Sequence, residues 1–479
     1  MTLVAGIDSS TQSCKVSVRD LASGREVRSG KAVHPPQTLV DPNVWWEALL
    51  AAVHDAGGLD DVAAISVSGQ QHTPIFLDGN GHAVSESPLW NDTGSHPHMV
   101  ALNQELGRDE WIRRTGLPLT LSDTVVKLRW LRDTNPRAAE QTEGVGVVHD
   151  WLTWRLMGYG PGTGGLEQLT TDRSEASGTA YWSGDTEDYC HDLVELALGH
   201  AVILPRVLGP LATAGRTAPG IPGIPAGIPL GVGSGDNAAA ALALGLVEGE
   251  TVLSLGTSGV VYARSSHTTH DFGGYVCSYA DATGDHLPLV ATLNAARNFD
   301  IGSRILGATH RELSDLALQA EPGAGGLTVL PYFEGERTPD VPDARGAVLG
   351  ASLVNFSREN LARAFVEGTV AGQVYMLDAL ANSHVATEKL ILIGGAAQSA
   401  AVQQVLGEMV SVPIAVPTPD EYVTKGAAMQ AAAALDGQFP SWTSSSTVLP
   451  ARDHQPQIAA QHASAKASLG YEAFAREEA

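Results

Sequence analysis

The segment that decides the fold reads Leu3-Val4-Ala5-Gly6-Ile7-Asp8-Ser9-Ser10-Thr11-Gln12-Ser13. A short apolar run ends here in a carboxylate and then in a row of residues that favour turns. Lys15–Arg19 next alternates polar and apolar side chains, which is typical of a returning strand with one buried face. The segment therefore predicts a strand–turn–strand hairpin with Asp8 at the end of its first strand.

The same order of elements recurs in the second half of the chain. Thr251–Leu255 predicts a strand, residues 256–259 a turn, and Val260–Arg264 a returning strand. Lys389–Ile393 predicts an apolar strand that ends in two glycines, much as the apolar run Val62–Ser68 ends in a glycine in the first half. A repeat this long indicates two similar α/β domains that face each other across a cleft.

The boundary between the two domains is expected at a run rich in proline and glycine. Ala214–Pro229 predicts a stiff, non-helical connector. We therefore expect an N-terminal domain over residues 1–228 and a C-terminal domain over residues 229–454. Residues 455–479 contain an alanine-rich stretch with helical spacing, and we expect this terminal helix to pack back on the first domain.

Composition excludes several classes of protein. Of the 479 residues, 43% are hydrophobic and 17% charged, as in folded globular proteins. The 53 acidic side chains outnumber the 29 lysines and arginines, and the net charge of −24 argues against nucleic acid or an anionic membrane surface as a partner. The three cysteines form no C-x-x-C pair and the N-terminus does not resemble a signal peptide, so we expect a cytoplasmic protein.

The two hairpin turns have the composition of phosphate-binding loops. Backbone N–H groups in such turns can point inward and hold oxyanions. Four hydroxyl side chains add donors: Thr11, Ser13, Thr257 and Ser258. Asp8, beside the first turn, is the kind of carboxylate that holds Mg²⁺ next to a phosphate. The alternative is that both hairpins are ordinary β-turns.

A second carboxylate, Asp236, follows the glycine-rich run Gly231–Gly235 and precedes an alanine-rich helix former. Glycines allow a ligand to approach the backbone closely, and a carboxylate there can act as the general base for a hydroxyl group. Asp236 can equally be the N-cap of the following helix. Both interpretations remain open from the residues alone.

A polar cluster in the first half has the chemistry of a sugar site. Sugar hydroxyls need paired donors and acceptors together with an aromatic face. The residues that supply them are Gln70, Gln71, His72, Trp90, Asn91 and Asp92. A structural hydrogen-bonding role is the alternative for His72.

The stretch Leu330–Pro339 is dense in proline, glycine and charge. This composition is typical either of a functional loop or of a structural clamp. The residues alone assign it no role.

At these positions the sequence resembles the FGGY family of carbohydrate kinases, and within that family the xylulokinases. The resemblance covers nearly the whole chain. The stretches that carry it, in the order found in the family, are Gly6–Thr11, Ser68–His72, Leu89–Asp92, Gly233–Ala239, Leu253–Gly259, Gly335–Pro339 and Ile393–Ser399. The sequence departs from the usual family pattern at Ser10, Gln71, Ala396 and Gln398, and none of these departures removes a carboxylate.

The resemblance implies two actin-like (ribonuclease H-like) α/β domains facing across a deep catalytic cleft. It implies ATP-dependent phosphorylation of D-xylulose to D-xylulose 5-phosphate with Mg²⁺. Asp236 would be the catalytic base, and Asp8 would hold the metal. The nucleotide would contact Thr11, Gln12, Ser13, Gly256, Thr257, Ser258, Gly394, Gly395 and Gln398. The sugar would contact Gln71, His72, Trp90, Asp236 and Asn237.

Two rival functions remain. One is a kinase for another ketose or polyol, such as ribulose, ribitol or a deoxy-ketose. The other is an actin-like ATPase or nucleotide sensor without sugar transfer, against which the polar cluster around His72 argues. The only macromolecular partner retained is a second copy of the chain, in a homodimer.

Overall fold

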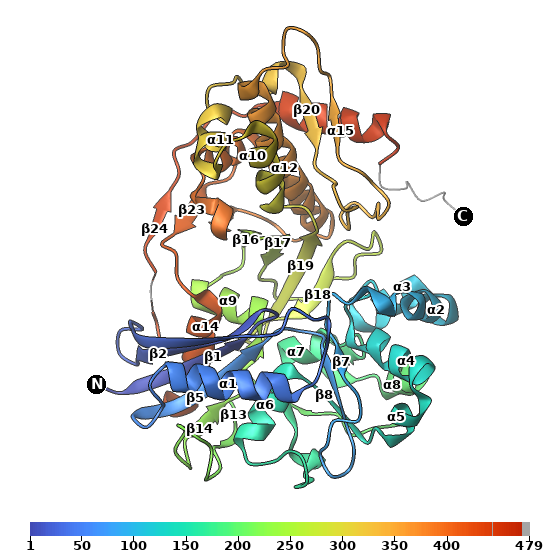
Figure 1. Cartoon of the computed structure of the whole chain (residues 1–479), viewed down its shortest axis with the longest axis vertical. Coiled ribbons are helices and arrows are strands. Elements are labelled where there is room, and N and C mark those ends of the chain that lie inside the picture. The colour runs from blue at the N-terminus through green and yellow to red at the C-terminus, as the bar shows by residue number, and fades with distance from the viewer. Residues whose placement is uncertain (443, 472–479) are drawn as a thin grey trace.

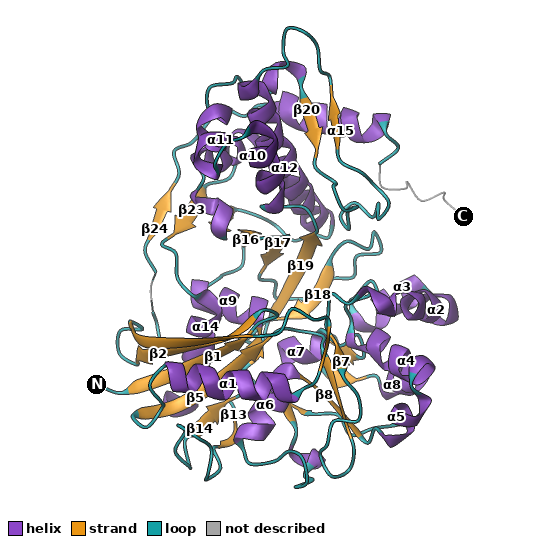
Figure 2. Ribbon diagram, viewed as in Figure 1, coloured by secondary structure: helices purple, strands orange, loops and turns teal. Residues whose placement is uncertain are grey.

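A computed structural model describes residues 1–442 and 444–471 of the chain. It has two lobes, each built around a large sheet, with the first half of the chain in one lobe and most of the second half in the other (Figure 1). Helices cover the sheets, as the colouring by secondary structure shows (Figure 2). The expected fold class, two α/β domains, is confirmed.

The first sheet has the strand order β13-β14-β5-β1-β2-β3, and the short strand β15 also pairs with β5. Its strands are β1 (Leu3–Ser9), β2 (Ser13–Asp20), β3 (Glu26–Val33), β5 (Val62–Gly69), β13 (Thr213–Arg216), β14 (Pro229–Gly231) and β15 (Ser234–Gly235). β1 pairs antiparallel with β2 and parallel with β5, so the predicted hairpin is confirmed.

The second sheet repeats this arrangement in the order β18-β19-β17-β16-β22-β23-β24. Its strands are β16 (Glu250–Leu255), β17 (Gly259–Ala263), β18 (Cys277–Ala280), β19 (His286–Thr292), β22 (Lys389–Ile393), β23 (Ile414–Pro417) and β24 (Ser446–Val448). β16 pairs antiparallel with β17 and parallel with β22, as β1 does with β2 and β5. The internal repeat expected from the sequence is therefore present in the sheets.

Both faces of β1 are buried, which explains its continuous apolar sequence. Alternate side chains point to opposite faces of a strand. Ala5 and Ile7 belong to the hydrophobic cluster that includes helix α1 (Asn43–Asp55), whereas Val4 belongs to a different cluster that includes helix α14 (Tyr422–Asp436).

Two helices lie between the sheets and contact each other closely: α9 (Asp236–Leu244) and α14. Their hydrophobic cluster contains Val4 of the first sheet and Val252 and Ile393 of the second. α14 comes from the second half of the chain, yet it packs on β1 and β5 of the first sheet. The two halves therefore share one layer of core.

Two expectations about the boundary between the domains are wrong. The boundary at 228/229 falls too early, because β14 and β15 belong to the first sheet. The Pro/Gly-rich run 214–229 closes the β13–β14 hairpin at the edge of that sheet and does not join the domains. Its composition excludes a helix but carries no information about which elements the loop connects.

The terminal helix, α15 (Pro456–Ser468), packs on the second domain and not on the first. It contacts α12 (Arg358–Asn382), α13 (Ala400–Met409) and β20 (Thr328–Leu330), and Ile458 is buried in their cluster. Amphipathic spacing predicts that the helix has a buried face but not which surface covers it. Residues 472–479 of the expected helix lie outside the described residues.

The remaining elements surround the two sheets. In the first lobe they are β4 (Leu39–Val40), β6 (Pro74–Leu77), β7 (Ser87–Pro88), η1 (Thr93–Ser95), α2 (His96–Leu106), α3 (Arg108–Thr115), α4 (Thr124–Thr134), α5 (Pro136–Gln141), β8 (Gly144–Val147), α6 (Val148–Leu156), η2 (Leu166–Gln168), β9 (Thr170–Asp172), α7 (Arg173–Ser177), β10 (Trp182–Ser183), β11 (Asp188–Tyr189), α8 (His191–Leu198) and β12 (Arg206–Leu208). In the second lobe they are α10 (Arg297–Leu306), α11 (His310–Ala317), η3 (Ala324–Gly326), β21 (Ala347–Leu349) and η4 (Gly395–Gln398). Among the described residues, no helix is both long and apolar enough to cross a membrane.

The contact between β1 and α14 depends on Gly6. A Cβ atom added there would lie 1.9 Å from the carbonyl oxygen of Thr424 and 2.5 Å from the backbone nitrogen of Ala428. Backbone atoms cannot move aside as a flexible side chain can, so Gly6→Ala should force α14 away from β1. We expect a loss of stability of at least about 1–3 kcal/mol, measured by thermal and urea unfolding.

Gly372→Ala is the matched control, because an added Cβ at this α12 position meets no atom within 4 Å. In a helix interior this change should leave the melting temperature unchanged or raise it. Equal melting temperatures for Gly6→Ala and the wild type would contradict the proposed close packing of α14.

Candidate active site

Three neighbouring parallel strands bring the first group of predicted residues together. β5 lies between β1 and β15, with Asp8 paired to Ser68 and Ser68 paired to Ser234. The carboxyl ends of parallel strands meet at one edge of a sheet, where ligands commonly bind in α/β folds. Asp8, the segment that follows Gly69, and Asp236 therefore share this edge.

Asp8 is 3% exposed and its two carboxylate oxygens have different surroundings. Oδ2 accepts a hydrogen bond of 2.6 Å from the Ser10 hydroxyl, whereas Oδ1 is buried and has no partner among the described residues. Burial raises the pKa of Asp8 to about 7; the Ser10 hydrogen bond opposes the rise, and the negative charge of Asp236 adds to it. An orphaned carboxylate oxygen in this place is suited to a cationic or hydrogen-bond-donating ligand.

Asp236 is the first residue of α9 and is partly buried. Its side chain does not cap the helix; Oδ1 accepts from the backbone nitrogen and the side-chain amide of Asn237, at 2.7 and 2.9 Å. Burial raises the pKa of Asp236 to about 6, although hydrogen bonds from the backbone oppose the rise. The helix-cap interpretation thus does not describe this side chain, which is ionised above about pH 6 and can accept a proton.

The loop that carries Asp236 is held from several sides. The Ser68 hydroxyl donates to the carbonyl oxygen of Ser234 at 2.8 Å, and the Gln430 amide of α14 donates to that of Gly233 at 2.6 Å. The backbone nitrogen of Gly235 donates to the Ser174 hydroxyl of α7 at 2.9 Å. Such support keeps the position of a catalytic carboxylate constant.

Gln71 and His72 lie next to this loop. Gln71 donates from Nε2 to the carbonyl oxygen of Ser174 at 2.9 Å, and its side chain packs directly against the backbone of Gly235. His72 adopts a positive φ of 74°, a strained conformation that is common at functional sites.

The protonation of His72 follows from its surroundings. Its Nδ1 lies 2.6 Å from the carbonyl oxygen of Gly178, which can only accept, so Nδ1 carries the proton. Burial, assisted by nearby positive charges, lowers the pKa of His72 to about 4. The ring is therefore neutral at pH 7 and Nε2 is an acceptor, which suits a substrate hydroxyl.

Other members of the predicted sugar cluster have varied roles. Trp90 donates from Nε1 to the Thr11 hydroxyl at 2.8 Å, which joins the cluster to the first hairpin turn. Asp92 accepts from the Gly94 backbone and the Thr38 hydroxyl, so its role is structural. Asn91 is exposed. The Gln70 side chain is buried, and its amide atoms have no partner among the described residues.

The residues predicted to bind the nucleotide fall into two groups. Thr11 and Gln12 lie in the β1–β2 turn, but Ser13 is the first residue of β2 and is buried, which makes its hydroxyl the least accessible of the three. The second group lies at the end of the second sheet, where β16 and β22 run parallel. It comprises Gly256, Thr257 and Ser258 after β16 and Gly394, Gly395 and Gln398 after β22.

Gly394 has a specific structural reason to be glycine. Its φ is 92°, and an added Cβ would lie 2.5 Å from the carbonyl oxygen of Leu255. The turn after β22 can therefore lie directly against the end of β16. Thr257 and Gln398 are exposed beside it, so both are accessible to a ligand.

Mg²⁺ is compatible with the residues present. The ion commonly takes only one or two protein carboxylates, and completes its shell with water and phosphate oxygens. The orphaned Oδ1 of Asp8 provides one such ligand. The described residues contain no cluster of three or more histidine, cysteine or acidic side chains that could hold a metal by themselves, so substrate oxygens would have to contribute.

Comparison with known families identifies the arrangement. Residues 3–243 match the N-terminal domain, and residues 251–435 the C-terminal domain, of the FGGY family of carbohydrate kinases. The chain belongs to the FGGY family of carbohydrate kinases. Its two family domains meet between α9 and β16, where the structure also separates the sheets.

Relatives of this FGGY kinase are similar over almost their full length. A xylulose kinase of Streptomyces rubiginosus is 39% identical over 452 residues, which cover 92% of this chain and 89% of that protein. The crystal structure of xylulose kinase from Bifidobacterium adolescentis has a TM-score of 0.90 and 40% identity, and covers 97% of this chain and 99% of its own. A glycerol kinase of Plasmodium falciparum, with ADP, shares the fold at 18% identity, a TM-score of 0.87 and coverage of 99% of both chains.

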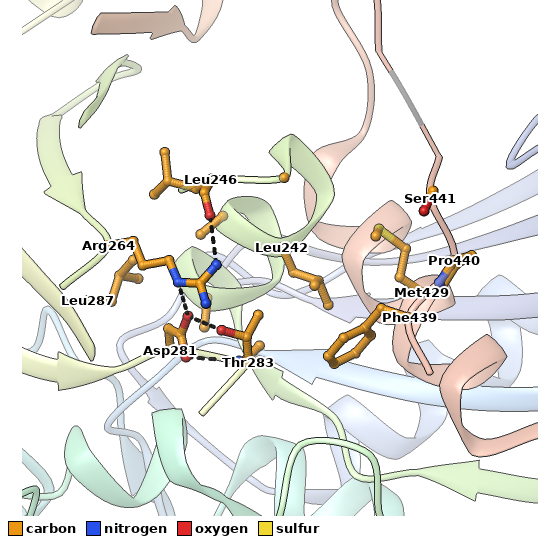
Figure 3. Close-up of a pocket in the computed structure, with 14 residues that line it drawn as sticks. Leu242, Leu246, Arg264, Asp281, Thr283, Leu287, Met429, Phe439, Pro440 and Ser441 are labelled. Carbon is orange, nitrogen blue, oxygen red and sulfur yellow. Dashed lines mark hydrogen bonds and ion pairs between the residues drawn. The ribbon is translucent and has the colours of Figure 1, made fainter. Parts of the chain in front are cut away.

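A cavity of about 230 Å³ lies elsewhere in the kinase, beside the other end of α9 (Figure 3). Leu242, Leu246, Leu287, Met429 and Phe439 form most of its apolar lining. Arg264 supplies a polar side, and donates at 2.8 Å to Asp285 and at 3.3 Å to the carbonyl oxygen of Leu246. No residue predicted from the sequence to contact substrate lines this cavity, so it is separate from the candidate active site.

Several residues of the site were not predicted from the sequence. Glu175 of α7 is fully buried near Asp236, and its carboxylate oxygens have no partner among the described residues. Its burial, together with the surrounding acidic groups, raises its pKa well above the usual range. Oδ1 of Asp123 lies 3.8 Å from Nδ1 of His72, and the centroids of the Tyr279 and His72 rings are 5.7 Å apart. For Asp123, the one sequence pattern that could have indicated a role was an acidic residue at the start of a helix. The strand that carries Tyr279 has no such pattern.

The raised pKa of Asp8 predicts a pH-dependent stability. The folded protein binds this proton more tightly than the unfolded chain does, so the stabilisation is fully present below about pH 4 and is lost as the pH rises through about 7. Asp8→Asn removes this dependence. In the absence of Mg²⁺, its melting temperature should exceed that of the wild type by at least about 2 °C at pH 8, with a smaller gain at pH 5.

Asp61→Asn is the control for this prediction. Arg28 lowers the pKa of the exposed Asp61, so the sign is reversed: its stabilisation is present at pH 8 and is lost in acid. Its removal should lower the melting temperature slightly at pH 8. An Asp8→Asn protein that is less stable than the wild type at pH 8 would contradict the burial of a carboxylate with a raised pKa.

Proposed function

We propose that the protein catalyses the reaction of ATP with D-xylulose to give ADP and D-xylulose 5-phosphate. The observation that carries the proposal is a proton-accepting carboxylate, Asp236, at the same sheet edge as the neutral acceptor His72, in a chain about 40% identical over nearly its full length to xylulose kinases. Asp8 at the same edge provides a site for the ion that accompanies ATP.

In this proposal Asp236 accepts the proton of the C5 hydroxyl as that oxygen attacks the γ-phosphorus of ATP. The new bond joins O5 to phosphorus, and the bond between phosphorus and the β–γ bridging oxygen breaks to leave ADP. Gln71, His72 and Asn237 would hold the sugar, with Trp90 at its side. Mg²⁺, when bound, would neutralise phosphate charge.

The two sheets would divide the nucleotide between them. The turn of Thr11 and Gln12 would contact the terminal phosphate, beside Asp8. Gly256, Thr257 and Ser258 would contact the other phosphates, and Gly394, Gly395 and Gln398 would line the adenosine site. Backbone N–H groups supply most of the donors in this scheme, which is compatible with a net charge of −24.

A panel of acceptors tests the proposal directly. ADP release and sugar phosphate should be measured with D-xylulose, D-ribulose, ribitol and glycerol, and without a sugar. We expect kcat/KM for D-xylulose to exceed that for the other acceptors by at least about tenfold, because hydrogen-bonding sites reject analogues that leave buried groups unpaired. A higher value for another acceptor would identify a different sugar kinase, and ADP release without any sugar phosphate would identify an ATPase.

Asp236→Asn tests the assignment of the base. Asparagine preserves the shape but cannot accept the proton, so kcat should fall by at least about 10² while ATP binding persists. The melting temperature at pH 8 should not fall, because a neutral group replaces a buried carboxylate. In the wild type, kcat/KM should also fall as the pH drops below about 6, where Asp236 is protonated.

Asp20→Asn is the control, since Asp20 lies on the surface and bonds the Ser23 hydroxyl at 2.6 Å. It should have wild-type kinetics. Near-normal turnover of Asp236→Asn would reject Asp236 as the base.

A further inference from the structure

The loop around Arg337 was conspicuous in the sequence but had no assigned role. In the structure its neighbours anchor it to the second domain. The Glu336 carboxylate is 2% exposed and accepts from the backbone nitrogens of Leu293 at 2.8 Å and of Arg337 at 2.7 Å. The Thr338 hydroxyl donates to the carbonyl oxygen of Ala291 at 2.8 Å. These bonds hold the backbone on both sides of Arg337.

The side chain of Arg337 has few hydrogen-bond partners, in contrast to the backbone on either side of it. A guanidinium carries five N–H donors and no acceptor. Among the described residues, its one hydrogen bond runs from Nη2 to the Cys277 sulfur at 3.7 Å, and sulfur is a weak acceptor. The side chain is partly exposed, so its remaining donors are available to a ligand.

Arg337 lies close enough to the predicted sugar cluster of the first domain for its charge to act there. The charge of Arg337 acts on both His72 and Asp123: it adds to the burial that lowers the pKa of His72, and it opposes the burial that raises the pKa of Asp123 to about 6. Tyr279 is on the same strand as Cys277, and its ring packs against the His72 ring with the two centroids 5.7 Å apart. Residues of the second domain therefore form part of the wall around His72.

The position of Arg337 along the site follows from the contacts of Gln71. Gln71 packs against Gly235, next to Asp236, while His72 lies further along, against Gly178 and Tyr279. Arg337 is thus at the His72 end of the row. In the proposed reaction Asp236 meets the C5 hydroxyl, so the His72 end would meet the other end of the sugar.

We propose that Arg337 is a sugar-binding residue that the second domain contributes: its free N–H donors bind oxygen atoms at the C1–C2 end of the ketose held by His72. The inference rests on the proposed function for the identity of the sugar. A ketose carbonyl oxygen accepts and cannot donate, which matches a group that donates and cannot accept. Sugar binding would then join the two domains, because residues of both domains would contact the sugar.

The competing explanation is structural. Arg337 could serve only to balance the charge of Asp123, whose buried Oδ1 has no hydrogen-bond partner among the described residues. The two explanations predict different sugar affinities for Arg337→Lys and for Arg337→Met combined with Asp123→Asn. Lysine keeps the charge but lacks the planar fork of donors.

The test is sugar affinity without ATP, measured by calorimetry with D-xylulose. Arg337→Met should weaken binding by about 10- to 100-fold, the range for a hydrogen bond from a charged group. The KM for ATP should stay within about twofold. Arg337→Lys should remain weakened while its melting temperature matches the wild type, which separates lost contact from misfolding.

A double substitution separates contact from charge balance. If Arg337 binds the sugar, Arg337→Met should weaken binding equally in the wild type and in Asp123→Asn. If it only balances charge, Asp123→Asn should remove the effect, and that result would overturn the proposal. Arg345→Met, at an exposed arginine further along the same segment, is the matched control and should bind sugar normally.

Hydrogen exchange gives a readout that does not depend on activity. D-xylulose alone should slow exchange in residues 335–339 of the wild type, and should not do so in Arg337→Met. Wild-type affinity in both Arg337→Met and Arg337→Lys would overturn the inference. If the wild type binds another sugar and not D-xylulose, the proposed substrate is wrong, and the Arg337 variants are then tested with that sugar.

Discussion

The parallel pairing of β5 with β1 on one side and β15 on the other is the constraint on which the site depends. It ends three strands at one edge, although Asp8 and Asp236 lie 228 positions apart in sequence. The pairing delivers Asp8, His72 and Asp236 to one place without any local sequence signal that joins them. Loss of this register would separate the carboxylates even if each strand still formed.

The close packing of α9 against α14 holds the two domains in a defined position relative to each other. A Cβ added to Gly426 of α14 would lie 2.0 Å from the carbonyl oxygen of Ala239, so the two helices approach at backbone distance. Gln430 of α14 also bonds the loop that carries Asp236. The candidate base is therefore held by a helix from the second half of the chain, and packing between the sheets and catalytic geometry share the same residues.

The buried carboxyl groups of the site, with few positive charges beside them, favour the binding of a cation. The charge of Asp236 acts on both Asp8 and Glu175, and burial raises the pKa of all three carboxyl groups. Few positive charges accompany them at this edge; Lys15 acts on Asp8, and Arg337 acts at the His72 end. A bound cation would stabilise the ionised form of Asp8, which links metal binding to its protonation state.

The sequence by itself determined the hairpins and the repeat of the two sheets, and it supplied the residues proposed for the chemistry, because apolar alternation, turn residues and glycine-flanked carboxylates are local patterns. Tertiary structure alone decided the rest. It placed α15 on the second domain and β14 in the first sheet, since an amphipathic face or a proline-rich loop does not specify its partner. It also brought Tyr279 and Arg337 to His72, because contacts between distant segments depend on how whole domains pack.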